Sequence, residues 1–275
     1  MTIGTVLLHM APDREREKRL DTALEMVRRF GAHLHVTYMT SPAAMPTAVT
    51  GRGASAAFIA ESTAIAHEKA AQVKREVETR CQSVIPSWEW EVLEGDHNAL
   101  LADRSRYADL AIVSENHGVS IEEYVGLHMP DELLLQAACP VLMLPRAVPV
   151  SAIGKRITIA WKNTREAARA VRGSLSLLKT AEHVIILTLD KPRHRFEEGR
   201  TLAEFLNRHG VECELVSDVS HGHGVGEVIL NYCDDLSADL LVMGAYGHHR
   251  WREIAFGGTT HHILKNMQTA VLTDH

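Results

Sequence analysis

The stretch that decides the fold runs from Ala238 to Thr260 and reads ADLLVMGAYGHHRWREIAFGGTT. It opens with the apolar run Leu240 to Met243, which is typical of a strand buried on both faces. Gly244 stops this run, and Gly244 and Gly247 bracket a turn. Glycine accepts positive φ and close backbone approach, so the backbone N–H groups of such a turn can point at an anion. The pattern predicts a place for a phosphate.

A second glycine pair follows nine residues after the first. Gly257 and Gly258 precede Thr259 and Thr260, either of which can cap a helix over residues 260–267. The N-terminus of such a helix offers free N–H groups and the positive end of a dipole. The alternative interpretation is an ordinary strand-to-helix connection in which the glycines serve only the turn.

The stretch resembles the nucleotide-binding signature of the universal stress protein family, G-x2-G-x9-G-(S/T). Gly244, Gly247 and Gly257 stand in the three glycine positions. Gly258 stands where the family has Ser or Thr, and Thr259 comes one residue late. The resemblance implies binding of ATP or a related adenine nucleotide, alone or with Mg²⁺.

Further site residues follow from the resemblance and from position after strands. Lys162 stands where many nucleotide-binding members carry Asp, and it either pairs with phosphate oxygens or is an exposed lysine. Trp161 either flanks the nucleotide or belongs to the core, and Leu189 falls where the family contacts adenine. The full expected set is Ala160, Trp161, Lys162, Leu189, Met243, Gly244, Tyr246, Gly247, His248, Arg250, Gly257, Gly258 and Thr259.

Composition restricts the class of protein. The chain has 275 residues, which favours two domains, and a formal net charge of −6, which disfavours binding to nucleic acid or to an anionic membrane. The four cysteines are widely spaced and predict free thiols in a reducing compartment. The sequence shows no signal peptide and no apolar run long enough to span a bilayer, so we expect a cytoplasmic protein.

The sequence contains an internal repeat that covers each half of the chain. Ala108-Asp109-Leu110 matches Ala238-Asp239-Leu240, 130 residues later, whereas Val6 and Ile157 are 151 residues apart. The first half therefore carries about 21 extra residues, which we assign to a loop over 41–57 and the start of the helix after it. We expect a universal-stress-like domain at 1–146, a linker at 147–154 and a second such domain at 155–275.

Hydrophobic periodicity predicts strands alternating with helices. The expected strands are 6–9, 33–39, 88–93, 110–113, 140–144, 157–161, 184–189, 212–217, 240–243 and 270–273. The expected helices are 13–30, 57–82, 98–107, 131–138, 164–179, 198–209, 226–233 and 260–267. This alternation predicts an α/β fold of two doubly wound, five-stranded parallel sheets. We expect each sheet to have the order 3-2-1-4-5, and with that order the ligand crevice lies between strands 1 and 4. The resemblance covers essentially the whole chain and matches tandem members of the family.

The two halves are not equivalent at the predicted site. Where the second half has Gly244 to Gly247, the first half has Ser114-Glu115-Asn116-His117. A carboxylate there opposes phosphate charge, and neither glycine is present. We therefore expect a degenerate site in the first half and about one nucleotide per chain.

The last strand of each half, at 141–144 and 271–273, would be an apolar edge if it were left unpaired. Single-domain members of the family commonly dimerise through this strand. The resemblance implies that the two halves pair through these strands as a pseudo-dimer, and further homodimerisation stays open.

Two other classes of function remain. The chain has 17 histidines, and His221-Gly222-His223 can present two imidazoles, so the first alternative is a metal-binding stress protein with His221 and His223 as candidate ligands. The second is a structural interaction module with no ligand. No familiar catalytic motif is present, and we expect at most slow ATP hydrolysis. The leading hypothesis is a regulatory stress-response protein.

Overall fold

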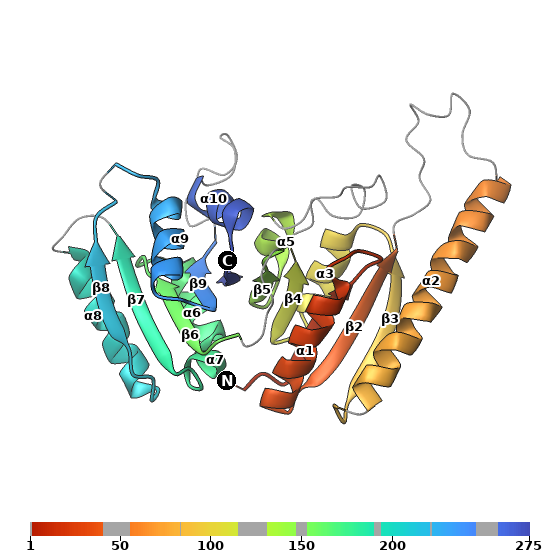
Figure 1. Cartoon of the computed structure of the whole chain (residues 1–275), viewed down its shortest axis with the longest axis horizontal. Helices are drawn as coiled ribbons and strands as arrows, with labels where there is room; N and C mark the ends of the chain where they lie inside the picture. Colours follow the sequence, from red (N-terminus) through yellow and green to blue (C-terminus); the bar gives the residue numbers. More distant parts are fainter. Residues whose placement is uncertain are drawn as a thin grey trace.

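The computed structural model of the chain describes residues 2–40, 56–82, 84–114, 131–146, 153–189, 194–220, 222–245 and 258–275 (Figure 1). Its strands are β1 Thr5–Met10, β2 His33–Thr40, β3 Trp88–Glu94, β4 Leu110–Ser114, β5 Val141–Leu144, β6 Arg156–Ala160, β7 His183–Leu189, β8 Glu214–Asp218, β9 Leu240–Gly244 and β10 Ala270–Asp274. Its helices are α1 Arg16–Phe30, α2 Ala56–Gln82, α3 His97–Ser105, α5 Asp131–Gln136, α6 Arg165–Gly173, α7 Leu175–Leu178, α8 His194–Arg208, α9 Val225–Asp235 and α10 Gly258–Asn266.

The strands form one ten-stranded sheet of order β3-β2-β1-β4-β5-β10-β9-β6-β7-β8. Within each half the order is the predicted 3-2-1-4-5, and neighbouring strands there run parallel. Figure 1 shows the strands fanning from β8 at one side to β3 at the other. The predicted doubly wound α/β fold is confirmed.

The two halves meet through β5 and β10. These strands pair antiparallel, with Leu272 opposite Leu142, Val271 opposite Met143 and Thr273 opposite Val141. All four residues of β5 are buried. The prediction that the two apolar edges pair within one chain is therefore confirmed.

Each face of the sheet carries a core that continues across both halves. Alternate residues of β1 show the division, because Val6 and Leu8 pack on one face and Leu7 packs on the other. Helices α1, α2, α6, α7 and α8 contribute to the first core, and α3, α5, α9 and α10 contribute to the second. The shared cores make the two halves one packed body.

The repeated Ala-Asp-Leu triplets have a structural cause. The Asp109 carboxylate accepts hydrogen bonds from the backbone N–H groups of Gly4 and Thr5 at 2.8 and 2.9 Å. Asp239 does the same at the start of β6, where it accepts from the N–H groups of Gly154, Lys155 and Arg156. In each half one carboxylate thus satisfies the donors at the entry to the central strand.

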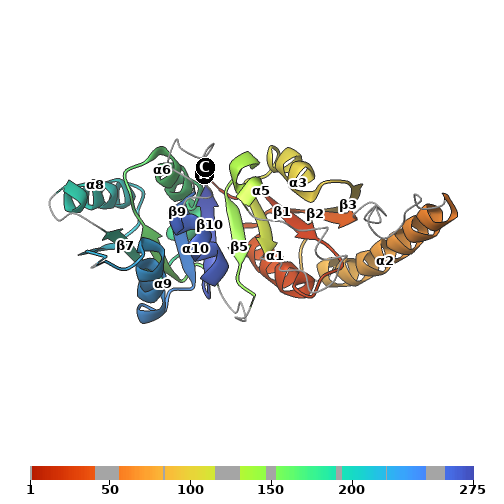
Figure 2. The same cartoon turned by 90° about the horizontal axis from the view of Figure 1, so that it is seen from above.

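The extra length of the first half falls where the sequence predicts it, between β2 and β3. Helix α2 has 27 residues, whereas its counterpart α8 has 15. Figure 2 shows α2 extending well past the end of the sheet. Of the loop predicted at 41–57, residues 41–55 lie outside the described part of the chain.

The helix predicted over 164–179 is interrupted. Thr164 caps it as expected, accepting a hydrogen bond from the Ala167 N–H at 3.3 Å, but α6 ends at Gly173 and α7 begins at Leu175. The break lies where the chain packs on the first half, since a Cβ at Gly173 would lie 2.2 Å from Cγ of Pro140. The end of α6 therefore coincides with a close contact between the two halves that admits only glycine.

Side chains of α1 hold the segment that joins the halves. The Arg29 guanidinium donates to the carbonyl of Ile153 at 2.8 Å and also contacts Thr180. The Lys18 ammonium donates to the carbonyl of Pro145. The first helix thus holds both the exit from β5 and the entry to β6.

We expect Gly173→Ala to destabilise the protein although Ala is the better helix former. The added methyl group overlaps Pro140, and overpacking of this kind typically costs about 1–3 kcal/mol. Urea unfolding measures the loss. The double variant Gly173→Ala, Pro140→Ala relieves the overlap and should be less destabilised than the two single effects added together. Strict additivity would contradict the contact.

Candidate functional site

The strand order of the second half reverses between β6 and β9. β6 pairs with β7 on one side and β9 on the other, with Ala160 opposite Met243 at the carboxyl ends. In open α/β sheets the ligand crevice lies at such a reversal. Gly244 is the last residue of β9, so the first glycine of the predicted motif lies at this crevice.

Gly244 is required by a close backbone contact. A Cβ at this position would lie 2.4 Å from the Ala167 nitrogen and 2.7 Å from the Glu166 carbonyl carbon, in the first turn of α6. Its φ lies outside the left-handed region, so the positive φ considered from sequence does not explain this glycine. The sequence suggested two reasons for a glycine at this position, positive φ and close backbone approach. Only close backbone approach applies to Gly244.

Side chains of the protein itself accept hydrogen bonds from backbone N–H groups at the N-terminus of α6. Thr164 accepts from the Ala167 N–H, and Glu166 in the first turn is 8% exposed and lies 3.2 Å from the Arg165 guanidinium. Burial acts to raise the pKa of Glu166, but hydrogen bonds from its own backbone N–H and the Thr164 hydroxyl lower it on balance. A carboxylate therefore already occupies the positive end of this helix.

Helix α10 presents a different N-terminus. It begins at Gly258, two residues before the predicted start, so Thr259 and Thr260 lie in its first turn and their predicted role as N-cap is wrong. Its first turn holds no acidic residue, and a Cβ built on Gly258 would meet no atom within 4 Å. Within the described residues, no carboxylate occupies the first turn of α10, whereas Glu166 lies in the first turn of α6.

The described residues of the expected site divide between the two faces of the sheet. Leu189 and Met243 are buried in the core beneath α9 and α10, and Ala160 packs against that core. Trp161 instead packs against the core beneath α6 and α8, in agreement with the core alternative for its side chain. Lys162 is exposed. The structure thus brings the three apolar residues together at one end of β6, β7 and β9.

Several expected residues lie outside the described part of the chain. These are Tyr246, Gly247, His248, Arg250, Gly257 and the candidate metal ligand His221. The glycine turn that would hold a phosphate therefore stays a prediction.

The corresponding crevice of the first half is filled by the protein itself. The Arg19 guanidinium is fully buried and donates to the His9 carbonyl at 2.8 Å, to the Ser114 hydroxyl and to the Asp13 carboxylate at 2.6 Å. Ser114 is the residue that replaces Gly244 in the repeat. An internal cation with its own counter-ion thus occupies the end of β1 and β4.

Two buried histidines lie beside this ion pair. The rings of His9 and His97 are 5.5 Å apart, and none of their four nitrogens has a hydrogen-bond partner among the described residues. Burial, followed by the Arg19 charge, holds the pKa of His9 well below its ordinary value. Burial lowers the pKa of His97 to about 4. Both rings are therefore neutral at pH 7.

Sequence reasoning missed this cluster, although a signal was present. Arg19 shares a helix face with Ala23 and Met26, which are both fully buried, and Asp13 lies six residues before it. A charged residue on the apolar stripe of a helix, with an opposite charge nearby, indicates a buried ion pair.

Comparison with known proteins identifies the second half. Residues 154–274 match the model of the universal stress protein family. These residues form a universal stress protein domain. A curated relative, universal stress protein Slr1230 of Synechocystis sp., is 37% identical over 73 residues, a stretch covering 26% of this chain and 24% of that protein. The match thus spans about a quarter of the relative's length.

Solved structures share the fold of the whole chain. A universal stress protein from Archaeoglobus fulgidus has a TM-score of 0.75 at 15% identity, with 98% of this chain and 97% of that chain covered. A protein from Pseudomonas aeruginosa has a TM-score of 0.60 at 18% identity, with 98% and 92% covered. At these identities the likeness shows the fold alone, including the tandem arrangement around the universal stress protein domain.

Metal ligands do not gather in the described ranges, where no group of three or more His, Cys, Asp and Glu side chains is placed to hold an ion. His223 lies 4.0 Å from Glu227, and its ring is largely exposed. Among the helices of the described segments, none combines the length and the apolar character needed to cross a membrane.

Gly244→Ala tests the contact between β9 and α6. We expect it to lower the free energy of unfolding by about 1–3 kcal/mol, because the methyl group overlaps the backbone of α6, which cannot rotate away. Gly258→Ala is the matched control and should be neutral or slightly stabilising, because the space beside it is open. Urea unfolding without nucleotide gives both values. Equal effects of the two substitutions would refute the contact.

The buried histidines predict a pH dependence of stability. Their folded-state pKa values lie below the unfolded value near 6.5, so the unfolded chain binds more protons between about pH 6.5 and 4. Stability should be full above pH 6.5 and fall on acidification, by up to about 1.4 kcal/mol per pH unit for each histidine. Urea unfolding from pH 8 to 5 measures this slope. His97→Gln should flatten it, whereas His183→Gln, at an exposed ring, should leave it unaltered.

Proposed function

We propose that the C-terminal half binds ATP or a related adenine nucleotide and that the protein is a regulatory member of the universal stress protein family. The observation that carries this proposal is the crevice between β6 and β9, where Gly244 ends β9, together with the first turn of α10, which holds no acidic residue. The α6 end already holds the Glu166 carboxylate. A bound phosphate is therefore expected at the turn from Gly244 to Gly247 and at the start of α10.

The proposed site residues fall into two chemical groups, apolar residues for the base and basic residues for the phosphate groups. Ala160, Leu189 and Met243 offer an apolar surface for a base at the ends of three strands. Lys162, with His248 and Arg250, supplies positive charge for phosphate oxygens. The remaining proposed contacts are Tyr246, Gly247, Gly257, Gly258 and Thr259, whereas Trp161 packs against the core on the other face of the sheet.

We propose no protein side chain as a ligand for Mg²⁺ at this site. Lys162 stands where related sequences carry an acid, and Glu166 already accepts hydrogen bonds from the helix backbone. A metal ion bound with the nucleotide would then be held by its phosphate groups, and Lys162 would supply the charge beside it. Among the described residues none is placed as a general base, which favours a regulatory role over turnover.

The first half supports one nucleotide per chain. Its crevice holds the Arg19 guanidinium, whose donors are taken by Asp13, Ser114 and the His9 carbonyl. A nucleotide there would have to displace a buried ion pair, and removing one partner of such a pair typically costs about 3–5 kcal/mol. We therefore propose a single functional site, in a cytoplasmic protein.

Native mass spectrometry of the purified chain tests the proposal directly. The expected result is a mass increase of one adenine nucleotide, identified by chromatography after denaturation. Two rival functions give other results. Metal in elemental analysis of untagged protein would support the histidine-rich alternative with His221 and His223, and an empty protein that binds no added nucleotide would support the structural module.

We expect Gly247→Asp to abolish nucleotide binding with little loss of stability. The added carboxylate opposes the phosphate charge and blocks approach to the backbone. Calorimetric titration with ATP measures the loss. His117→Asp, at the corresponding position of the first half, is the control and should leave affinity and the stoichiometry of one per chain unaltered. Unchanged ATP affinity in Gly247→Asp, or two equivalent sites per chain, would refute the assignment.

A further inference from the structure

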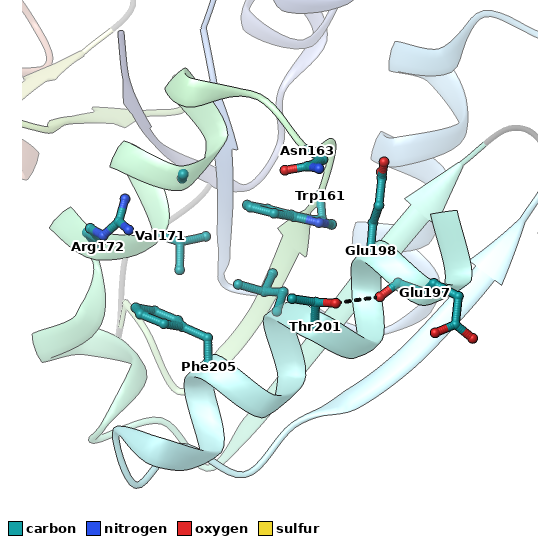
Figure 3. A pocket seen from close by; sticks show the side chains of 10 residues that line it. Trp161, Asn163, Val171, Arg172, Glu197, Glu198, Thr201 and Phe205 are labelled. Atoms are coloured by element: carbon teal, nitrogen blue, oxygen red, sulfur yellow. Dashed lines mark hydrogen bonds between the residues drawn. The ribbon is translucent and has the colours of Figure 1, made fainter. Parts of the chain in front are cut away.

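A separate pocket of about 430 Å³ lies between α6 and α8 (Figure 3). It opens on the face of the sheet opposite to Leu189 and Met243, since its residues Val171 and Leu202 belong to the other core. Pockets for small molecules typically measure about 300–1,000 Å³. The pocket is thus large enough for a small organic ligand and distinct from the crevice of the proposed nucleotide site.

The two helices that form the pocket are held in place elsewhere. Helix α8 lies close on the sheet, because a Cβ at Gly199 would be 2.5 Å from Leu215 Cδ1 and 3.1 Å from Thr188 Cγ2. Helix α6 is held by its backbone contact with Gly244. Since neither helix can settle deeper onto the sheet, the space between them is a fixed feature of the packing.

The walls of the pocket are apolar and aromatic. Trp161 spans the space between the helices in Figure 3, with Val171 on the α6 side and Phe205 on the α8 side. Leu202 adds to the apolar surface, and it is 5% exposed. The Trp161 Nε1–H is buried and has no hydrogen-bond partner in the part of the chain that the structure describes. These walls fit a flat or linear apolar body.

The two ends of the pocket carry opposite charges. At one end the Arg172 guanidinium lies 5.7 Å from the centre of the Phe205 ring. At the other end Figure 3 shows Glu198 and Asn163 beyond Trp161. Arg172 is exposed, whereas Glu198 is partly buried. The less solvated charge interacts more strongly with a ligand, so the Glu198 end dominates.

Glu198 is the acid available to a ligand. Its neighbour Glu197 is paired with Arg200 at 2.8 Å, whereas Glu198 forms no ion pair with another residue of the described ranges, so its carboxylate can serve a cation. The face of the Trp161 indole is a second attractive surface for a cation at this end.

We propose that the pocket between α6 and α8 binds a small organic cation, an aromatic or alkyl primary amine. Its apolar body lies between Trp161 and Phe205, and its ammonium group contacts the Glu198 carboxylate and the Asn163 side chain. An organic acid of the same size would bring its carboxylate against Glu198 at one end, or would pair at the other end with the exposed Arg172 guanidinium, whose attraction is screened by solvent. The pocket therefore selects by charge.

Calorimetric titration of the full chain with phenethylamine and phenylacetate tests this selectivity, because the two probes have similar size and opposite charge. We expect one phenethylamine per chain and at least about fivefold weaker binding of phenylacetate. Glu198→Gln should weaken phenethylamine binding by about fivefold. Glu204→Gln, an exposed acid of the same helix outside the pocket, is the matched control and should have no effect.

Other results would overturn the proposal. Equal affinity for the two probes would show that charge does not select the ligand. Unchanged phenethylamine binding in Glu198→Gln would remove the residue on which the proposal rests. Displacement of phenethylamine by ATP would make the pocket part of the nucleotide site. Loss of ATP binding alone, as in Gly247→Asp, should leave phenethylamine affinity unaltered, so failure of the two proposals can be told apart.

Discussion

The antiparallel pairing of β5 with β10 is the constraint on which the rest of the structure depends. Each half alone would end in a strand buried on both faces, with its backbone donors and acceptors unpaired on one side. Joining the two edges in one chain satisfies those groups and turns two small sheets into one. The cores on both faces then run without a break across the junction, so Gly173 of the second half packs against Pro140 of the first.

The two halves have the same strand order, but different residues lie in their crevices. In the first half the end of β4 carries Ser114, whose hydroxyl accepts from a buried guanidinium, and the charge is balanced by Asp13. In the second half the end of β9 carries Gly244, which lets the α6 backbone approach and itself contributes no side chain to the crevice. In the first half the Arg19 guanidinium donates to acceptors of the protein itself, whereas in the second half the first turn of α10 holds no acidic residue. The asymmetry follows from the side chains at two equivalent positions.

Sequence periodicity predicted the elements and the order of the strands because those depend on local pattern and on the repeat. The matched triplets at Asp109 and Asp239 fixed the register of the two halves, and the structure gives them the same task. Features that depend on tertiary contact were not predicted. The break between α6 and α7 lies where Gly173 contacts Pro140 of the other half, and Arg19 donates to Ser114, 95 residues away in the chain. A helix pattern alone cannot reveal either partner.

Helix α6 links the parts of the molecule that matter for function. Its first turn contacts Gly244 at the crevice, its last residue contacts Pro140 at the junction of the halves, and Val171 between them lines the pocket shared with α8. Close-packed backbone contacts at both ends leave little freedom for the helix to shift at one end alone. A ligand that moves the end of β9 must therefore act against the junction and the pocket together. Such coupling would require two conformations of the protein that differ in the position of α6, and a ligand with a different affinity for each. This condition holds for every ligand-driven change of conformation.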